Sequence, residues 1–272
     1  MAARAERVPA DEVRQRMLDA GRALALEAGA ALTIERLRLE EVIQRARVPR
    51  SSVYRLWAYR EEYIDDLLCY LAGAGSAFSD RPVFAPQTLA DTQQMLDANR
   101  HLLASPDGRR AIIREVVRIT TTANYQALTE SKEWRLHMAL VATLGSTRTS
   151  QARQLIAATL EEAQQRTRES LVAMFEHVAG EVGLRLRDPA WSAAHLQLAG
   201  GLLVQSMALR NLQVQAADGA PTAADVDALL NAPVPGPGLT GEPAEWTLTA
   251  FAYLGLFEAF VELDPDWVPP ER

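Results

Sequence analysis

The chain has almost no cysteine, no long apolar run and no signal-peptide pattern. Its 272 residues include one cysteine, Cys69, which excludes an internal disulfide and fits a reducing compartment. No uninterrupted run of about 20 apolar residues occurs, and the amino-terminal MAARAERVPADE lacks the apolar stretch of a signal peptide. We therefore expect no membrane-spanning segment and a cytoplasmic location.

Patterns that carry catalytic or metal-binding chemistry are equally scarce. The four histidines are isolated, and none lies one helical turn from another histidine or from the cysteine; they are His101, His137, His177 and His195. The chain has no P-loop and no dinucleotide-binding Gly-x-Gly-x-x-Gly that follows a strand pattern. We therefore expect no metal, no cofactor and no enzymatic activity.

Apolar residues recur at helical spacing along most of the chain, which predicts an all-α protein. Beyond residue 60, helices are expected at 61–77, 88–104, 108–129, 132–146, 150–181, 189–215 and 245–263, with a short one at 222–230. Residues 216–244 contain five prolines and several glycines. They are expected to form an exposed loop around the short helix, and a gate to a pocket is the alternative.

Residues 32–68 have the pattern of two short helices around a tight turn. Apolar residues at helical spacing from Leu37 to Ala46 predict a first helix, and Val48-Pro49 supplies the break, because proline disfavours a helical predecessor. In the second helix the outward side chains can all donate hydrogen bonds to phosphates or base edges; they are Arg50, Ser51, Ser52, Tyr54 and Arg55. Val53, Leu56 and Trp57 remain as anchors. The layout is typical of a DNA-reading helix-turn-helix.

Residues 12–72 resemble the amino-terminal domain of the TetR (tetracycline repressor) family of regulators. That family has an apolar first helix ending in Glu-x-Gly, a turn around Gly-Val, a recognition helix ending in Tyr-x-x-aromatic, and a basic residue at the next helix start. The corresponding segments here are Leu24–Gly29, Ala46–Val48, Arg50–Trp57 and Arg60. The resemblance implies a DNA-binding domain at 1–77, a helical ligand-binding and dimerisation domain at 78–272, and a seam near 78–87.

The resemblance assigns DNA contact to seven residues: Arg38, Arg50, Ser51, Ser52, Tyr54, Arg55 and Arg60. The first residues of the second helix would face base edges or nearby phosphates, while Tyr54, Arg55 and Arg60 would mainly hold phosphates. The amino-terminal residues 1–10 are expected to be a tail; the alternative is that Arg4 and Arg7 reach an adjacent minor groove.

Three positions depart from the family pattern. Arg47 stands where the family usually has the turn glycine, at a cost of about 1 kcal/mol if the backbone there is left-handed. Arg38 and Pro49 stand where hydroxyl residues usually cap the two helices. The cap geometry therefore has to differ from that of the family.

Charge is distributed unevenly along the chain. Residues 1–60 hold 12 Arg and 8 Asp plus Glu, a net charge of +4, whereas residues 61–272 have a net charge of −11. A basic segment on an acidic body is the pattern expected of a DNA-facing module. The alternative is an ordinary solvated charged surface.

Two late helices are apolar on more than one face. They are expected near 189–215 and 245–263, and helices that are apolar nearly all round are buried. Burial inside one chain is one possibility. The resemblance implies instead that they pair with their copies in a two-fold homodimer.

The resemblance also implies a small-molecule pocket among the middle helices. Its candidate residues are polar or aromatic side chains within apolar helices: Asn99, Arg118, Tyr125, Trp134, His137, Met138, Met174, Phe175 and His195. Such a lining favours a largely apolar organic ligand.

The resulting hypothesis is a regulator, most simply a repressor, that a small-molecule effector releases from its double-stranded DNA operator. The alternatives are an all-helical ligand-binding protein or enzyme whose helix-turn-helix is only structural, and a helical interaction module.

Overall fold

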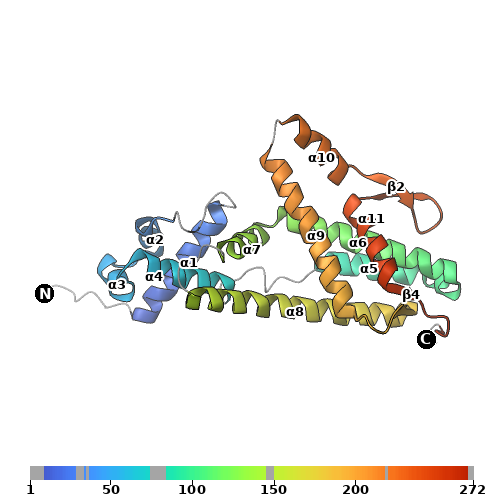
Figure 1. The fold of residues 1–272 in the computed structure, drawn as a ribbon, viewed down its shortest axis with the longest axis horizontal. Coiled ribbons are helices and arrows are strands. Elements are labelled where there is room, and N and C mark those ends of the chain that lie inside the picture. Colours follow the sequence, from blue (N-terminus) through green and yellow to red (C-terminus); the bar gives the residue numbers. More distant parts are fainter. Residues whose placement is uncertain are drawn as a thin grey trace. The chain divides into compact units, whose positions relative to one another are not determined.

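The structure is a computed structural model that describes residues 9–28, 34, 37–73, 84–144, 150–217 and 220–268. Helices dominate these residues and the strands are short, as expected of an all-α protein (Figure 1). The chain divides into two compact units, of which the first holds residues 1–81 and 131–166 and the second holds residues 82–130 and 167–272. The sequence placed the boundary at residue 77 and did not anticipate that residues 131–166 group with the first unit. The tail at 1–8 and most of the seam at 78–87 lie outside the described residues.

Among the described residues of the first unit, six helical segments surround one core. They are α1 (Ala10–Ala28), α2 (Leu39–Ala46), α3 (Arg50–Leu56), α4 (Arg60–Ala72), α7 (Lys132–Thr143) and the first part of α8 (Ser150–Val182). Helix α1 packs against α2, α3, α4 and α7. Its buried residues Val13 and Met17 lie four positions apart, so they share the face that meets Leu67 and Leu71 of α4.

Tyr63 of α4 lies in this core where α4 comes close to α1. Its hydroxyl donates a hydrogen bond to the Met17 carbonyl at 3.0 Å, and its ring is fully buried. A Cβ atom at Gly21 would overlap the Tyr63 hydroxyl and would lie 2.9 Å from Cδ1 of Leu67. The missing side chain at Gly21 therefore permits the close packing of α1 on α4.

The second unit surrounds the long helix α6. It contains α5 (Pro86–Ala98), the 3-10 helix η3 (Arg100–Ala104), α6 (Pro106–Glu130), the rest of α8, α9 (Ala193–Ala216), α10 (Pro221–Asn231) and α11 (Leu248–Phe260). Helix α6 packs against α5, α9 and α11, and α9 packs against α10 and α11. Val117 of α6, Leu196 of α9 and Phe257 of α11 meet in the main core of this unit.

Two short antiparallel strand pairs interrupt these helices, and both correct a prediction from the sequence. β1 (Leu184–Leu186) pairs with β4 (Val261–Leu263), so the helix predicted over 245–263 ends at Phe260. β2 (Val234–Pro237) pairs with β3 (Pro243–Trp246) inside the segment predicted to be a loop. The fully buried Trp246 explains this pairing, because its indole N–H donates to the Pro237 carbonyl at 3.2 Å.

The spacing Gly-x-Gly-x-x-Gly occurs at Gly236, Gly238 and Gly241, directly after β2 begins. The chain then turns back into β3, with Gly241 at a φ of +86°, and no helix starts there. A dinucleotide-binding motif requires a helix at this point, because the helix N-terminus holds the pyrophosphate. These glycines therefore belong to a hairpin turn.

A buried arginine ties the end of the described chain to α6. Arg109 is 7% exposed, and it donates to the carbonyl oxygens of Asp264 at 3.2 Å and Gly183 at 3.5 Å. Its guanidinium lies 5.1 Å from the ring centre of Trp267, whose indole N–H donates to the Gly180 carbonyl at 2.8 Å. These partners stabilise a charge that is otherwise costly to bury.

We expect Gly21→Ala to lower the free energy of unfolding by about 1–3 kcal/mol, because the new methyl group must displace Tyr63 or Leu67. This loss outweighs the gain of about 1 kcal/mol that alanine usually has over glycine inside a helix. Urea unfolding followed by circular dichroism measures it. The control is Gly180→Ala on α8, where a Cβ atom meets nothing within 4 Å, so this substitution should be neutral or stabilising. Stabilisation by Gly21→Ala would contradict the tight contact.

Candidate functional site

Helix α3 is attached to the first unit on one side and is exposed on the other. Val53 is fully buried, and Trp57, directly after the helix, is 3% exposed. The Trp57 indole N–H donates to Asp66 Oδ2 at 2.8 Å, and its ring meets Tyr63 edge-on with centroids 5.2 Å apart. The outward side chains Arg50, Ser51, Tyr54 and Arg55 are exposed, and Ser52 is half-buried. The predicted division therefore holds for the anchors Val53 and Trp57 and for the four exposed side chains, whereas the predicted anchor Leu56 is half-buried like Ser52.

The turn between α2 and α3 places Arg47, which stands where the TetR family usually has glycine, in a left-handed backbone conformation. Arg47 adopts φ 53° and ψ 44°, the left-handed conformation, and it has the only positive φ of any non-glycine residue among those described. Neither Arg38 before α2 nor Pro49 before α3 caps its helix with a side-chain hydrogen bond. Buried Val48 holds the turn against the core instead.

Glu40 of α2 engages the outward face of α3. Arg50 Nη2 donates to Glu40 Oε1 at 2.6 Å, and the Tyr54 hydroxyl lies 3.5 Å from the same oxygen. Arg55 bonds within its own helix, to Ser52 Oγ at 3.1 Å and the Ser51 carbonyl at 3.3 Å. Because the Arg50–Glu40 pair is more than half exposed, solvent screens it and it contributes little to stability.

Arg60 has a partner inside the first unit that the sequence did not suggest. Its side chain is half-buried, and Nε and Nη2 donate to the Leu37 carbonyl at 3.2 and 3.0 Å. The contact links the start of α4 to Leu37, two residues before α2 begins. Arg38, by contrast, is exposed.

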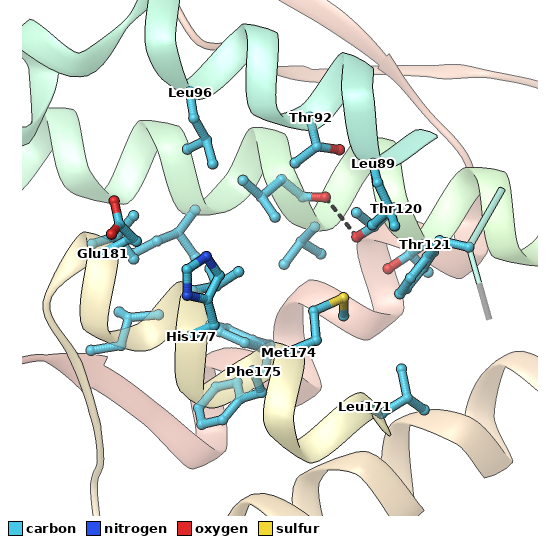
Figure 2. A pocket seen from close by; sticks show the side chains of 18 of the residues that line it. Leu89, Thr92, Leu96, Thr120, Thr121, Leu171, Met174, Phe175, His177 and Glu181 are labelled. Carbon is cyan, nitrogen blue, oxygen red and sulfur yellow. Dashed lines mark hydrogen bonds between the residues drawn. The ribbon is translucent and has the colours of Figure 1, made fainter. Parts of the chain in front are cut away.

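The second unit contains a cavity of about 250 Å³. It is lined mainly by apolar side chains from α5, α6, α8, α9 and α11, and Figure 2 shows one view of it. Each helix contributes residues three or four apart, for example Leu89, Thr92 and Leu96 on α5. The helical repeat therefore turns one stripe of each helix toward the same space.

A few polar side chains interrupt this apolar lining. They are Thr92, Thr120, Thr121, Asn124, Gln197 and Tyr253, together with Gln93 and the ionisable Arg100, His177 and Glu181. Burial raises the pKa of Tyr253 to about 12, so its hydroxyl remains protonated at neutral pH. The cavity thus combines a mainly apolar surface with a few neutral and ionisable polar groups, the combination typical of small-molecule sites.

Of the nine residues predicted to bind a ligand, Met174 and Phe175 line this cavity. Trp134, His137 and Met138 belong to α7 of the first unit instead. Trp134 is completely buried there, and burial lowers the pKa of His137. The α7 residues and the cavity are thus in different units.

The other four predicted residues lie in the second unit but make local contacts outside the cavity lining. Arg118 pairs with Glu115 at 2.6 Å, and the Tyr125 hydroxyl donates to Asn231 Oδ1 at 2.9 Å. Asn99 donates to a carbonyl of the preceding turn, and His195 Nδ1 lies 2.8 Å from Ser192 Oγ.

Helices α9 and α11 also leave apolar side chains in solvent. Leu198, Leu202 and Leu209 of α9 are 49%, 57% and 39% exposed, and Phe251 of α11 is 53% exposed. A Cβ atom at Gly201 would meet nothing within 4 Å. The three leucines share one stripe of α9 by helical spacing, and exposed apolar residues of this size are typical of an interaction surface. We call these four residues the apolar face.

None of the described helices is both long enough and apolar enough to cross a membrane. No protein family, curated protein or solved structure matches this chain.

We expect Arg47→Gly to raise the free energy of unfolding by up to about 1 kcal/mol, because glycine adopts the left-handed conformation without a Cβ clash. Urea unfolding of the two proteins measures the difference. Arg47→Ala is the matched control, since it removes the same exposed charge and keeps the Cβ atom. An equal gain from both variants would assign the effect to charge and contradict the backbone explanation.

Proposed function

We propose that this protein is a sequence-specific DNA-binding transcriptional regulator of the TetR type, and not an enzyme. It acts in the cytoplasm as a repressor that a small-molecule effector releases from its operator. The observation that carries the proposal is α3, a short helix anchored through Val53 and Trp57 that exposes hydrogen-bonding side chains on its other face.

The exposed chemistry of α3 suits the major groove of DNA. Arg50 can bond to guanine through two donors, and Ser51 and Ser52 can bond to base edges or phosphates. Tyr54 and Arg55 would hold phosphates and set the register of the helix. Arg60 already bonds to the Leu37 carbonyl, so we assign it an indirect role, the positioning of the start of α4.

Charge supports the same assignment. Residues 1–60 have a net charge of +4, although the whole chain has a net charge of −7. Positive charge near α3 attracts the phosphate backbone, and the acidic remainder disfavours DNA elsewhere on the chain. Because the exposed Arg50–Glu40 pair is weak, a phosphate or a guanine can replace Glu40.

We further propose a two-fold homodimer built on the apolar face of α9 and α11. Leucines at positions 198, 202 and 209 of α9 recur at helical spacing and remain exposed in one chain. A second copy would remove them from water and form a four-helix contact. Two copies of α3 would then read a palindrome in major grooves about 34–36 Å apart, or further by whole turns.

The cavity of the second unit supports a second candidate function, that of a helical ligand-binding protein in which α2 and α3 are only structural. Selection of binding sites from a random DNA pool at about 0.15 M salt, where weak nonspecific attraction is screened, separates the two. Enrichment of a palindrome is expected. A folded protein that enriches no sequence would contradict the regulator and favour the ligand-binding protein.

Replacing Arg50 with alanine is expected to weaken binding to the selected operator by about 1–3 kcal/mol and to relax specificity at one base position. Fluorescence anisotropy with single-base operator variants measures both effects. Arg110→Ala, an exposed arginine on α6, is the matched control and should leave binding unchanged. If Arg50→Ala weakened binding to every sequence equally, Arg50 would be a phosphate contact.

Replacing Leu202 with glutamate is expected to raise the dissociation constant of the dimer by at least about 100-fold, because two-fold symmetry buries two unpaired carboxylates. Sedimentation equilibrium measures it. The control is Leu229→Glu on α10, where the leucine is 70% exposed and lies outside the apolar face. A wild-type monomer, or a dimer that Leu202→Glu leaves intact, would contradict this interface.

A further inference from the structure

The cavity of the second unit contains buried polar side chains that the protein itself leaves without partners. Gln197 is 8% exposed and Thr121 is 5% exposed, and both line the cavity. Within the described part of the chain, neither side chain makes a hydrogen bond to another residue. Their polar atoms are not among the fully shielded ones, so they face the open space of the cavity, and these two groups indicate which hydrogen bonds a ligand there can form.

Gln197 is the more informative of the two. It lies on the same stripe of α9 as Gly200 and Gly201, which also line the cavity. A Cβ atom at Gly200 would overlap the Tyr253 ring, so this stripe of α9 packs closely against α11. The Gln197 side chain on the same stripe therefore lies inside the second unit. A primary amide has two donors and one acceptor, and it can therefore pair with a ligand group that both donates and accepts.

Two other hydroxyls of the lining already donate their hydrogen bond to a backbone carbonyl of their own helix. Thr92 Oγ1 donates to the Thr88 carbonyl at 2.7 Å. Thr120 Oγ1 donates to the Val116 carbonyl at 2.7 Å, the bond drawn as a dashed line in Figure 2. Each hydroxyl therefore presents only acceptor lone pairs to the cavity. A ligand group that donates a hydrogen bond is favoured beside them.

The ionisable residues His177 and Glu181 of the lining lie apart from Thr120 and Thr121. Figure 2 shows Glu181 and His177 toward one end of α8 and the two threonines toward the other side. Arg100 is already paired with Asp97 at 3.0 Å. A charged ligand group among the threonines would lose its hydration without gaining an opposite charge, which is strongly unfavourable.

The cavity has room for an organic ligand, because its volume of about 250 Å³ far exceeds the roughly 10–15 Å³ that one water molecule needs on the same measure. We propose that this cavity binds an uncharged, largely apolar organic molecule, whose single polar group both donates and accepts hydrogen bonds and pairs with Gln197. Its role as the effector rests on the proposed regulatory function, whereas its binding does not.

The test uses four octyl compounds of equal chain length: octanamide, 1-octanol, octanoate and octylammonium. Each is titrated into the full-length protein in an isothermal titration calorimeter at pH 7.5, where the last two are ionised. Octanamide is expected to bind at least about tenfold more tightly than either ion. Equal or tighter binding of an ion, or no binding of any of the four compounds, would overturn the proposal.

Variants locate the polar contact. Gln197→Leu should weaken octanamide binding by about 2- to 10-fold, the range of one neutral hydrogen bond. The same change at Gln215, exposed near the end of α9, is the matched control and should have no effect. Gln197→Glu keeps the shape and should shift the preference toward octylammonium, which tests the position even if Gln197→Leu fails to fold. An unchanged preference in a folded Gln197 variant would overturn the assignment.

Operator binding is measured in the same samples. The expected preference in a protein that binds no DNA would support the ligand class and contradict the regulator. Conversely, sequence-specific DNA binding without the octyl preference would overturn the ligand class and leave the regulator standing.

Discussion

A seven-residue helix has too few internal hydrogen bonds to persist alone in water, so α3 depends on the side chains that attach it to the first unit. Val53 and Trp57 supply these attachments. Asp66 fixes the Trp57 indole and also accepts a hydrogen bond from Arg14 of α1 at 3.1 Å. The orientation of the exposed residues of α3 is therefore set by the packing of α1 on α4, to which Gly21 and Tyr63 contribute most directly.

Helical periodicity was sufficient to predict most of the fold. Residues 108–129 and 150–181 were expected to be helical, and α6 and α8 extend only one or two residues beyond them. The β2–β3 hairpin was missed because its prolines and glycines give no strand-like alternation. Its cause is a tertiary contact, since the buried Trp246 finds its acceptor at Pro237, nine residues away.

The candidate sites were predictable to different degrees. On α3, the same apolar pattern that predicts a helix also identifies Val53 and Trp57 as anchors, and the remaining residues must face outward. In the cavity, a polar residue such as Gln197 on an apolar helix is compatible with either solvent or interior. Only the packing of α9 against α6 and α11 decides whether Gln197 faces solvent or the interior. The one sequence feature that indicated the interior was its spacing of one helical turn from Gly200, which packs closely on α11. Arg60 was similarly ambiguous, because its acceptor at Leu37 lies 23 residues away.

The contact between Arg109 and Asp264 has a consequence for biosynthesis. The two residues are 155 positions apart, and ribosomes add about 5–20 residues per second, so roughly 8–30 s separate their appearance. During that interval the Arg109 guanidinium lacks its contacts with the Asp264 carbonyl and the Trp267 ring, so the packing around α6 is incomplete. The second unit therefore cannot finish folding before Asp264 and Trp267 have been synthesised, and a nascent chain that stalls before residue 264 would expose the apolar stripes of α6 to chaperones and proteases.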